Sequence, residues 1–117
     1  MYAYIKGVLH EINPSAVVIE TYGIGYKIFI PAHVSQKMPQ VGKEVILFTS
    51  FIVRELAHTL YGFLSVQERD FFDALLNVTG IGPKIALALI GAMPLDLLQK
   101  AIVNEEILTL CLSLIHI

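Results

Sequence analysis

The sequence has no tryptophan, a single cysteine and a small share of charged residues. Of its 117 residues, 56% are hydrophobic and 15% are charged, which excludes a disordered chain. Soluble domains have about 45–50% apolar and about 25% charged residues, so the apolar excess needs a membrane, a partner surface or a further part of the protein to cover it. The lone Cys111 excludes an intrachain disulfide and a cysteine-based zinc site, and it fits a reducing compartment.

The sequence also lacks a basic excess, a signal peptide and a long apolar run. The formal net charge is -2, so any contact with DNA must be local. No basic start followed by an apolar core is present at the N-terminus. A membrane-spanning helix needs roughly 20 apolar residues. Pro94 and Asp96 interrupt the stretch 85–98, and the apolar stretch 107–117 is too short. We therefore expect a cytoplasmic protein.

Catalytic and cofactor motifs are scarce. No serine lies in a nucleophile elbow, and the glycine-containing segment fits neither a Walker loop nor a dinucleotide fingerprint. We therefore expect no cofactor, no metal and no catalytic residue. Asp96 is the only candidate residue for a DNA-processing enzyme, and a chain of this length leaves little room for a base-flipping pocket. The histidines share no metal-ligand spacing; they are His10, His33, His58 and His116.

Residues 1–63 have the pattern of short strands. Apolar and β-branched runs alternate with turn signals, which predicts strands at 4–11, 17–20, 26–30, 44–53 and 59–63 and a short helix within 32–38. Five short strands with one short helix favour a small closed barrel. We expect an OB-fold domain at residues 1–63.

From Leu64 the apolar period becomes helical. Ser65 and Glu68 have the spacing of a capping box, in which the serine hydroxyl accepts from the amide of residue 68 and the glutamate reaches back. We expect a first helix that ends near 78–79, a second at 83–90, and a third that begins at Leu95. The predicted fold class is therefore α+β, with an all-helical domain at residues 64–111.

The segment between the first two predicted helices carries the chemistry. Gly80 and Gly82 allow a tight turn with no side chain in front of the backbone, and Ile81 is expected to point inward. The second helix then begins with unpaired N–H groups and the positive end of its dipole. With the charge of Lys84, this predicts a site for a DNA phosphate that ignores base identity. A plain interhelical turn is the other interpretation; the full spacing, Ala86 included, favours a helix-hairpin-helix motif.

Several stretches of the sequence resemble the RuvA family. They are Tyr-Gly-Ile-Gly-Tyr at 22–26, Phe-Thr-Ser-Phe-Ile-Val-Arg-Glu at 48–55, Leu-Tyr-Gly-Phe at 60–63, Gln-Glu-Arg at 67–69, Gly-Ile-Gly-Pro-Lys at 80–84 and Ala-Leu-Ala at 86–88. The family is the DNA-binding subunit of a bacterial Holliday-junction branch-migration complex, which acts in recombination and repair. The resemblance implies an OB-like domain, a domain with two helix-hairpin-helix motifs, and a small C-terminal domain. It implies that residues 80–84 form the first phosphate-binding hairpin.

The resemblance also implies partners. Four subunits of the family form a plate that holds the open junction, and the RuvB ATPase pumps the DNA arms across it. The RuvC resolvase is a further partner by the same resemblance. We therefore expect a homotetramer that binds four-way junctions and itself hydrolyses nothing.

The family assigns a role to residues 54–56. Arg54 and Glu55 match a loop that faces the junction centre, where two adjacent acids usually form an acidic pin that repels phosphates. We expect Arg54 to contact DNA and Glu55 to act as the pin. Leu56 follows in place of a second acid, so we expect a weaker pin. Without the resemblance, Arg54 and Glu55 would be an ordinary charge pair at a hairpin tip.

The sequence departs from the family after Cys111. The family continues into a second hairpin with a Pro-Gly-hydrophobe-Gly-Lys-Lys core, whereas residues 112–117 read Leu-Ser-Leu-Ile-His-Ile. We therefore expect a truncated chain with a non-native tail at 112–117, without the second phosphate site and the RuvB-binding domain. The net charge of -2 and the apolar content favour an alternative function, an oligomeric protein-interaction adaptor that does not bind DNA.

Overall fold

The computed structural model describes residues 2–54 and 56–92. The predicted third helix and the tail at 112–117 lie outside these residues. The chain divides into two compact units with the boundary after Asp70, within helix α2 (Val66–Leu75). The first turn of α2 therefore groups with the N-terminal unit. The expected domain boundary after Phe63 stays a prediction.

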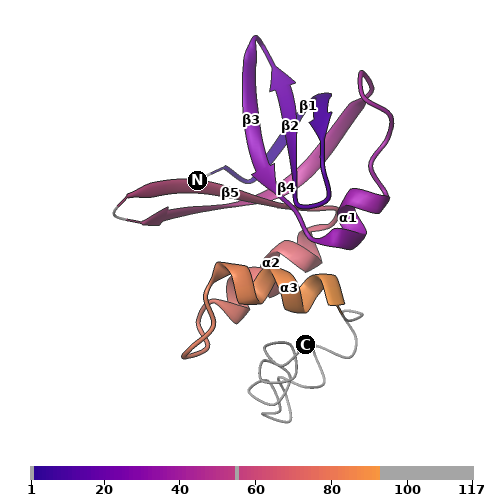
Figure 1. Ribbon diagram of the computed structural model, residues 1–117. Helices are drawn as coiled ribbons and strands as arrows, with labels where there is room; N and C mark the ends of the chain where they lie inside the picture. Colours follow the sequence, from indigo (N-terminus) through magenta and orange to yellow (C-terminus); the bar gives the residue numbers. More distant parts are fainter. Residues whose placement is uncertain (1, 55, 93–117) are drawn as a thin grey trace. The chain divides into compact units, whose positions relative to one another are not determined.

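The N-terminal unit is a closed five-stranded barrel (Figure 1). Its strands follow the order β1–β2–β3–β5–β4, and all neighbours are antiparallel except β3 and β5, which are parallel. This arrangement confirms the predicted OB-type barrel. The strands are β1 (Tyr4–Ile12), β2 (Ala16–Thr21), β3 (Ile24–Phe29), β4 (Glu44–Arg54) and β5 (Ala57–Phe63).

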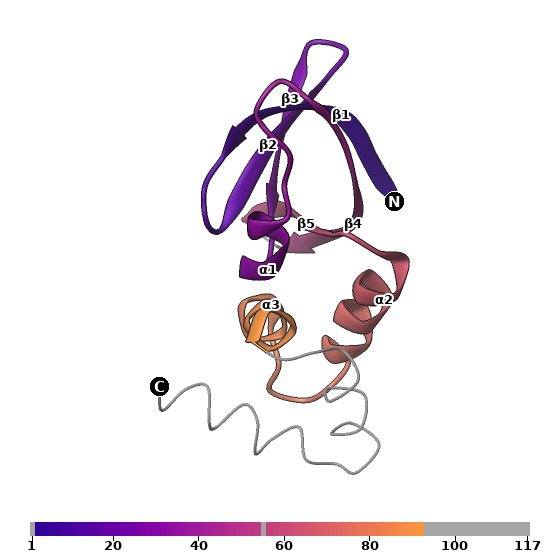
Figure 2. The same cartoon turned by 90° about the vertical axis from the view of Figure 1, so that its right-hand side faces the viewer.

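The barrel interior is filled by alternate side chains of the strands. Because successive residues of a strand point to opposite faces, every second residue faces inward, and the inward residues of the core cluster are apolar. Helix α1 (Ala32–Gln36) lies at one end of the barrel (Figure 2) and adds Val34, which is fully buried, to the same cluster. The other buried members are Ile5, Leu9, Val17, Ile19, Ile28, Ile30 and Leu47.

Helices α2 and α3 (Pro83–Ala92) follow the barrel, joined by residues 76–82. The amides of Asn77 and Val78 donate to carbonyls three residues back, at 3.1 and 3.0 Å, so the end of α2 tightens after Leu75. The helix therefore ends earlier than the predicted 78–79. The second helix begins at Pro83 as predicted.

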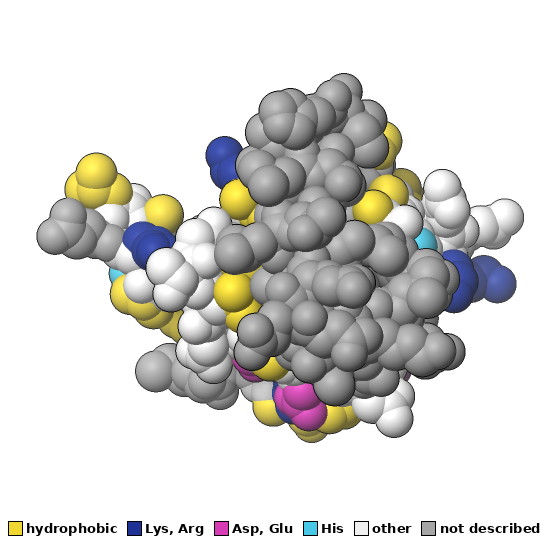
Figure 3. All heavy atoms as spheres, turned by 90° about the horizontal axis from the view of Figure 1, so that it is seen from below, with side chains coloured by type: hydrophobic (Ala, Val, Ile, Leu, Met, Phe, Trp, Pro, Cys, Tyr) yellow, Lys and Arg dark blue, Asp and Glu magenta, His cyan; other side chains and the backbone are white. Residues whose placement is uncertain are grey.

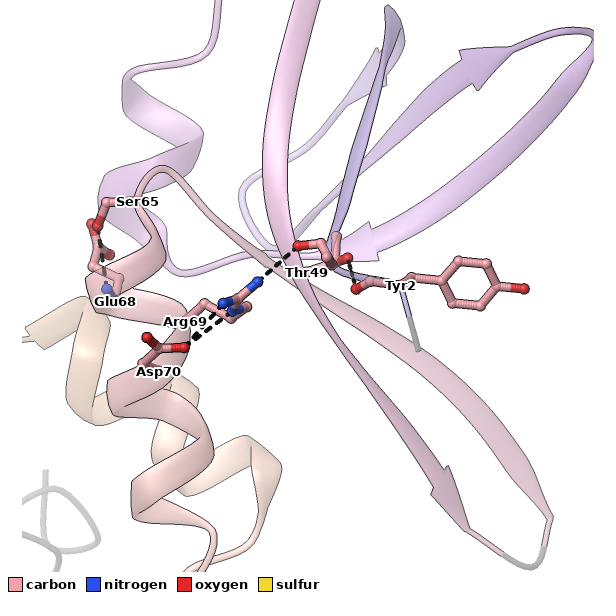
Figure 4. A network of polar contacts seen from close by, with 7 residues as sticks. Tyr2, Thr49, Ser65, Glu68, Arg69 and Asp70 are labelled. Atoms are coloured by element: carbon pink, nitrogen blue, oxygen red, sulfur yellow. Dashed lines mark hydrogen bonds and ion pairs between the residues drawn. The ribbon is translucent and has the colours of Figure 1, made fainter.

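The predicted capping box is half correct. The Glu68 amide donates to Ser65 Oγ at 3.2 Å, as expected (Figure 4). The Glu68 carboxylate does not reach back to the backbone; its Oε2 lies 2.7 Å from Nε2 of His33, on α1. The carboxylate that the local pattern assigned to the helix cap therefore contacts a histidine on α1 instead.

A second set of polar contacts ties the first turn of α2 to the N-terminal segment (Figure 4). Arg69 Nη1 donates to the carbonyl of Ala3 at 3.0 Å, and Nη2 lies 3.1 Å from Asp70 Oδ1. Thr49, which is buried on β4, donates its hydroxyl to the carbonyl of Tyr2 at 2.6 Å. These bonds satisfy main-chain carbonyls that precede β1.

We expect the His33–Glu68 pair to contribute about 1 kcal/mol to the stability of the folded state. Its side chains are only 28% and 17% exposed. A double-mutant cycle with His33→Gln and Glu68→Gln, measured by urea unfolding, should therefore give a clear coupling energy. The control is the His10–Glu20 pair, at 3.5 Å with side chains 60% and 49% exposed, for which we expect almost none. Equal coupling in the two pairs would contradict the prediction.

Candidate nucleic-acid interface

The turn before α3 has the backbone shape that the sequence predicts. Gly80 has a φ of +87°, in the left-handed region that favours glycine, and Ile81 is buried with 6% exposure. The Ile81 amide donates to the carbonyl of Val78 at 3.1 Å, which closes the turn. Ala86, one turn into α3, is fully buried. Ile81 therefore points inward as expected, while Gly80 stays on the surface.

The turn leaves backbone donors at the start of α3. The Ala86 amide donates to the carbonyl of Gly82 at 3.0 Å, so Gly82 precedes the first helical turn. Within the described part of the chain, the amides of Gly82, Lys84 and Ile85 have no backbone acceptor. Pro83 has no N–H to satisfy. These donors lie at the positive end of the helix dipole, which is an arrangement that suits an anion.

The space beside the two glycines of the turn is open in the described part of the chain. A Cβ atom built on Gly80 or Gly82 meets nothing within 4 Å beyond its own chain neighbours. Lys84 is exposed in the first turn of α3. The structure thus brings together Gly80, Ile81, Gly82 and Lys84 as the sequence predicted. Their role in binding DNA stays a prediction at this point.

Arg54, the other predicted DNA contact, lies at the end of a long hairpin. β4 and β5 pair from Phe48 with Phe63 out to Arg54 with Ala57, and the hairpin projects from the barrel (Figure 1). Arg54 is exposed, and Leu56 at the tip is 99% exposed. Figure 3 shows hydrophobic and basic side chains next to one another at this projecting end. Glu55, the predicted acidic pin, lies outside the described residues.

The turn and Arg54 belong to different units, so each is a separate candidate contact. Among residues 2–54 and 56–92, no three His, Cys, Asp or Glu side chains are grouped as a metal site. The described helices include none with the length and apolar character needed to span a membrane.

Sequence reasoning missed the surroundings of the histidines. His33 binds Glu68, and His58 packs edge-on against the ring of Phe51 at 5.7 Å. The β4–β5 register pairs Val53 with His58, and Phe51 lies two residues before Val53 on the same face of β4. Only this register could have suggested the contact between Phe51 and His58. No local signal links His33 to a residue 35 positions away.

The fold places the chain in the class of proteins with an OB-type barrel. Comparison with known families identifies the particular family within this class. The model of the RuvA N-terminal domain matches residues 1–62, and the chain belongs to this family.

Several relatives of the chain carry the name Holliday junction branch migration complex subunit RuvA. The protein from Protochlamydia amoebophila (strain UWE25) is 52% identical over 111 residues, 95% of this chain and 55% of the relative. The protein from Yersinia pseudotuberculosis serotype O:1b (strain IP 31758) is 41% identical over 110 residues, 94% of this chain and 54% of the relative.

A third relative of the same name, from Sodalis glossinidius (strain morsitans), is 39% identical over 107 residues. That match covers 92% of this chain and 52% of the relative. The chain thus spans about half the length of the curated relatives it matches. The similarity extends well beyond the barrel and includes most of the helical part.

Proposed function

We propose that this chain binds four-way DNA junctions through backbone amides at the start of α3, without reading base sequence. The observation that carries the proposal is the turn at 80–82. Among the described residues, it leaves the amides of Gly82, Lys84 and Ile85 without backbone acceptors, and it places no side chain at Gly80 or Gly82, where a Cβ atom would meet open space. A phosphate oxygen accepts from such donors, and the exposed ammonium of Lys84 adds a charge that attracts it. The helix-hairpin-helix character of residues 64–111 is part of this proposal.

The junction itself is proposed from the family. The relatives are named as subunits of a Holliday junction branch migration complex. We therefore propose that the chain acts as a non-catalytic homotetrameric scaffold, with the RuvB ATPase and the RuvC resolvase as partners. The turn supplies affinity and the symmetric assembly supplies the preference for four arms. Such a substrate is consistent with the cytoplasmic location expected from the sequence.

The hairpin end contributes through charge in this proposal. Arg54 is exposed there and contacts a phosphate, while Glu55 repels phosphates from the centre of the junction. A single acid per subunit gives a weaker pin than two would. Leu56 occupies the position of the second acid.

The test is a gel-shift titration with a four-way junction and a linear duplex of equal length. We expect the chain to retain the junction in preference to the duplex. We also expect affinity to fall steeply with salt, because each neutralised phosphate releases about one counterion. Equal retention of the two DNAs would refute junction selectivity. An oligomer in light scattering that binds neither DNA would support the adaptor function instead.

A further inference from the structure

A cationic and aromatic strip lies on the outer face of the barrel where β3 meets β5. We define the aromatic strip as Lys27, Phe29 and Tyr61. The parallel register pairs Ile28 with Leu60 and Phe29 with Tyr61. Ile28 is fully buried in the core, and Leu60 packs against the same cluster. Phe29 and Tyr61, as their neighbours along the strands, therefore face outward side by side.

The three side chains of the strip are in contact range. The ring centroids of Phe29 and Tyr61 are 6.1 Å apart, with the planes tilted by 39°. Nζ of Lys27 lies 5.3 Å from the centre of the Phe29 ring, a cation–π distance. Both rings are partly exposed, and Lys27 is exposed. Neither ring belongs to the hydrophobic core of the barrel, so the strip is a surface feature.

The two strands that carry the strip have no negatively charged side chain. Strands β3 and β5 contain no acidic residue, and their one fully charged side chain is that of Lys27. Burial raises the pKa of the Tyr61 hydroxyl above its usual 10.0, and the positive charge of Arg54 acts in the opposite direction. The phenol is therefore neutral at physiological pH. The acid on the neighbouring strand, Glu20, lies at the rung of Gly25 and is 3.5 Å from His10 Nδ1.

We propose that the aromatic strip binds unpaired bases of single-stranded DNA. Bases stack on exposed aromatic rings whatever their identity, and OB-type barrels present such rings on their outer strands. Phe29 and Tyr61 offer two neighbouring rings, and Lys27 neutralises the phosphate between the bases. A protein partner would find apolar rings here too, but the absence of acids from β3 and β5 favours a polyanion. The inference rests on the proposed DNA function and adds a second surface, separate from the turn at 80–82.

The experiment measures the binding of a fluorescein-labelled oligothymidylate by anisotropy, with the whole chain. We expect Phe29→Leu and Tyr61→Leu each to weaken binding roughly tenfold, and Tyr61→Phe to retain it, because stacking needs the ring and not the hydroxyl. Lys27→Gln should reduce the slope of affinity against salt by about 0.7, the value for one phosphate of a single strand. The matched control is Tyr4→Leu, an aromatic 57% exposed on β1, which should bind as the parent chain does.

The outcomes separate this inference from the proposed function. Gly80→Ala, which alters the turn, should weaken junction binding more than oligothymidylate binding. Circular dichroism checks that each variant is folded; should Tyr61→Leu fail to fold, Phe29→Leu and Lys27→Gln decide. The inference is wrong if the folded strip variants bind oligothymidylate as tightly as the parent, or if Tyr4→Leu loses as much. It is equally overturned if the strip variants lower the oligomeric state in light scattering with oligothymidylate affinity unchanged.

Discussion

Gly80→Ala is expected to weaken binding of a four-way DNA junction by roughly tenfold or more, the loss that follows from misplacing one charge-assisted hydrogen bond to phosphate. Gly80 has a φ of +87°, and alanine is strained in that region by about 1–2 kcal/mol. Relief of this strain rotates the turn and moves the amides of Gly82 and Lys84. Junction affinity is measured by anisotropy or gel shift at fixed salt.

The matched control for this variant is Gly42→Ala. Gly42 has a φ of +99° and, like Gly80, has no atom within 4 Å of a built Cβ. The two variants should therefore lose similar stability, and only Gly80→Ala should lose affinity. A companion variant, Gly82→Val, tests shielding without left-handed strain, because its Cβ also meets open space. Parent-like junction binding by Gly82→Val, or equal loss in Gly42→Ala, would count against amides of the turn as the contact.

Gly7→Ala should destabilise the barrel by about 3 kcal/mol, at the upper end of the usual cost of overpacking. Gly7 lies on β1 opposite Val45 of β4. A Cβ there overlaps the main-chain oxygen of Glu20 and comes within 2.9 Å of Ile19 Cγ2 on β2. The main chain must move, because a backbone oxygen cannot rotate away as the end of a side chain can. Urea unfolding measures the loss as a lower midpoint.

The control for Gly7→Ala is Gly25→Ala on β3. Its Cβ meets only Val18 Cγ1, at 3.2 Å, and a methyl group can shift by a few tenths of an ångström. Both substitutions reduce the entropy of the unfolded chain equally. We therefore expect Gly25→Ala to change the stability by less than about 1 kcal/mol. Equal midpoints for the two variants would show that β1 and β2 tolerate a side chain at Gly7.

The fold of residues 2–54 and 56–63 was largely predictable, because its signals are local. Alternation and turn residues placed the strands within a few positions, and they indicated the barrel. The turn at 80–82 was predictable for the same reason, since two glycines around one apolar residue determine its backbone. The exact helix ends were not, because bonds to carbonyls three residues back tighten the chain after Leu75.

Features that join distant parts of the sequence were not predictable. The capping box assigned Glu68 to its own helix, whereas the folded chain gives the carboxylate to His33 on α1. The aromatic strip escaped notice because Phe29 and Tyr61 become neighbours only through the parallel pairing of β3 with β5. The pattern of a strand shows which residues share a face, but it does not show which strand will lie beside it.

That parallel pairing is also the narrowest join of the barrel. It has two partner pairs, Ile28 with Leu60 and Phe29 with Tyr61, whereas the β4–β5 ladder runs from Phe48 with Phe63 out to Arg54 with Ala57. The β4–β5 hairpin joins strands that are consecutive in the sequence, whereas β3 pairs with a strand that lies far along the chain, so we expect the barrel to close late in folding. We therefore expect local opening of the barrel to begin at this pair of strands. A molecule stacked on the aromatic rings of Phe29 and Tyr61 would stabilise the pairing and slow its opening.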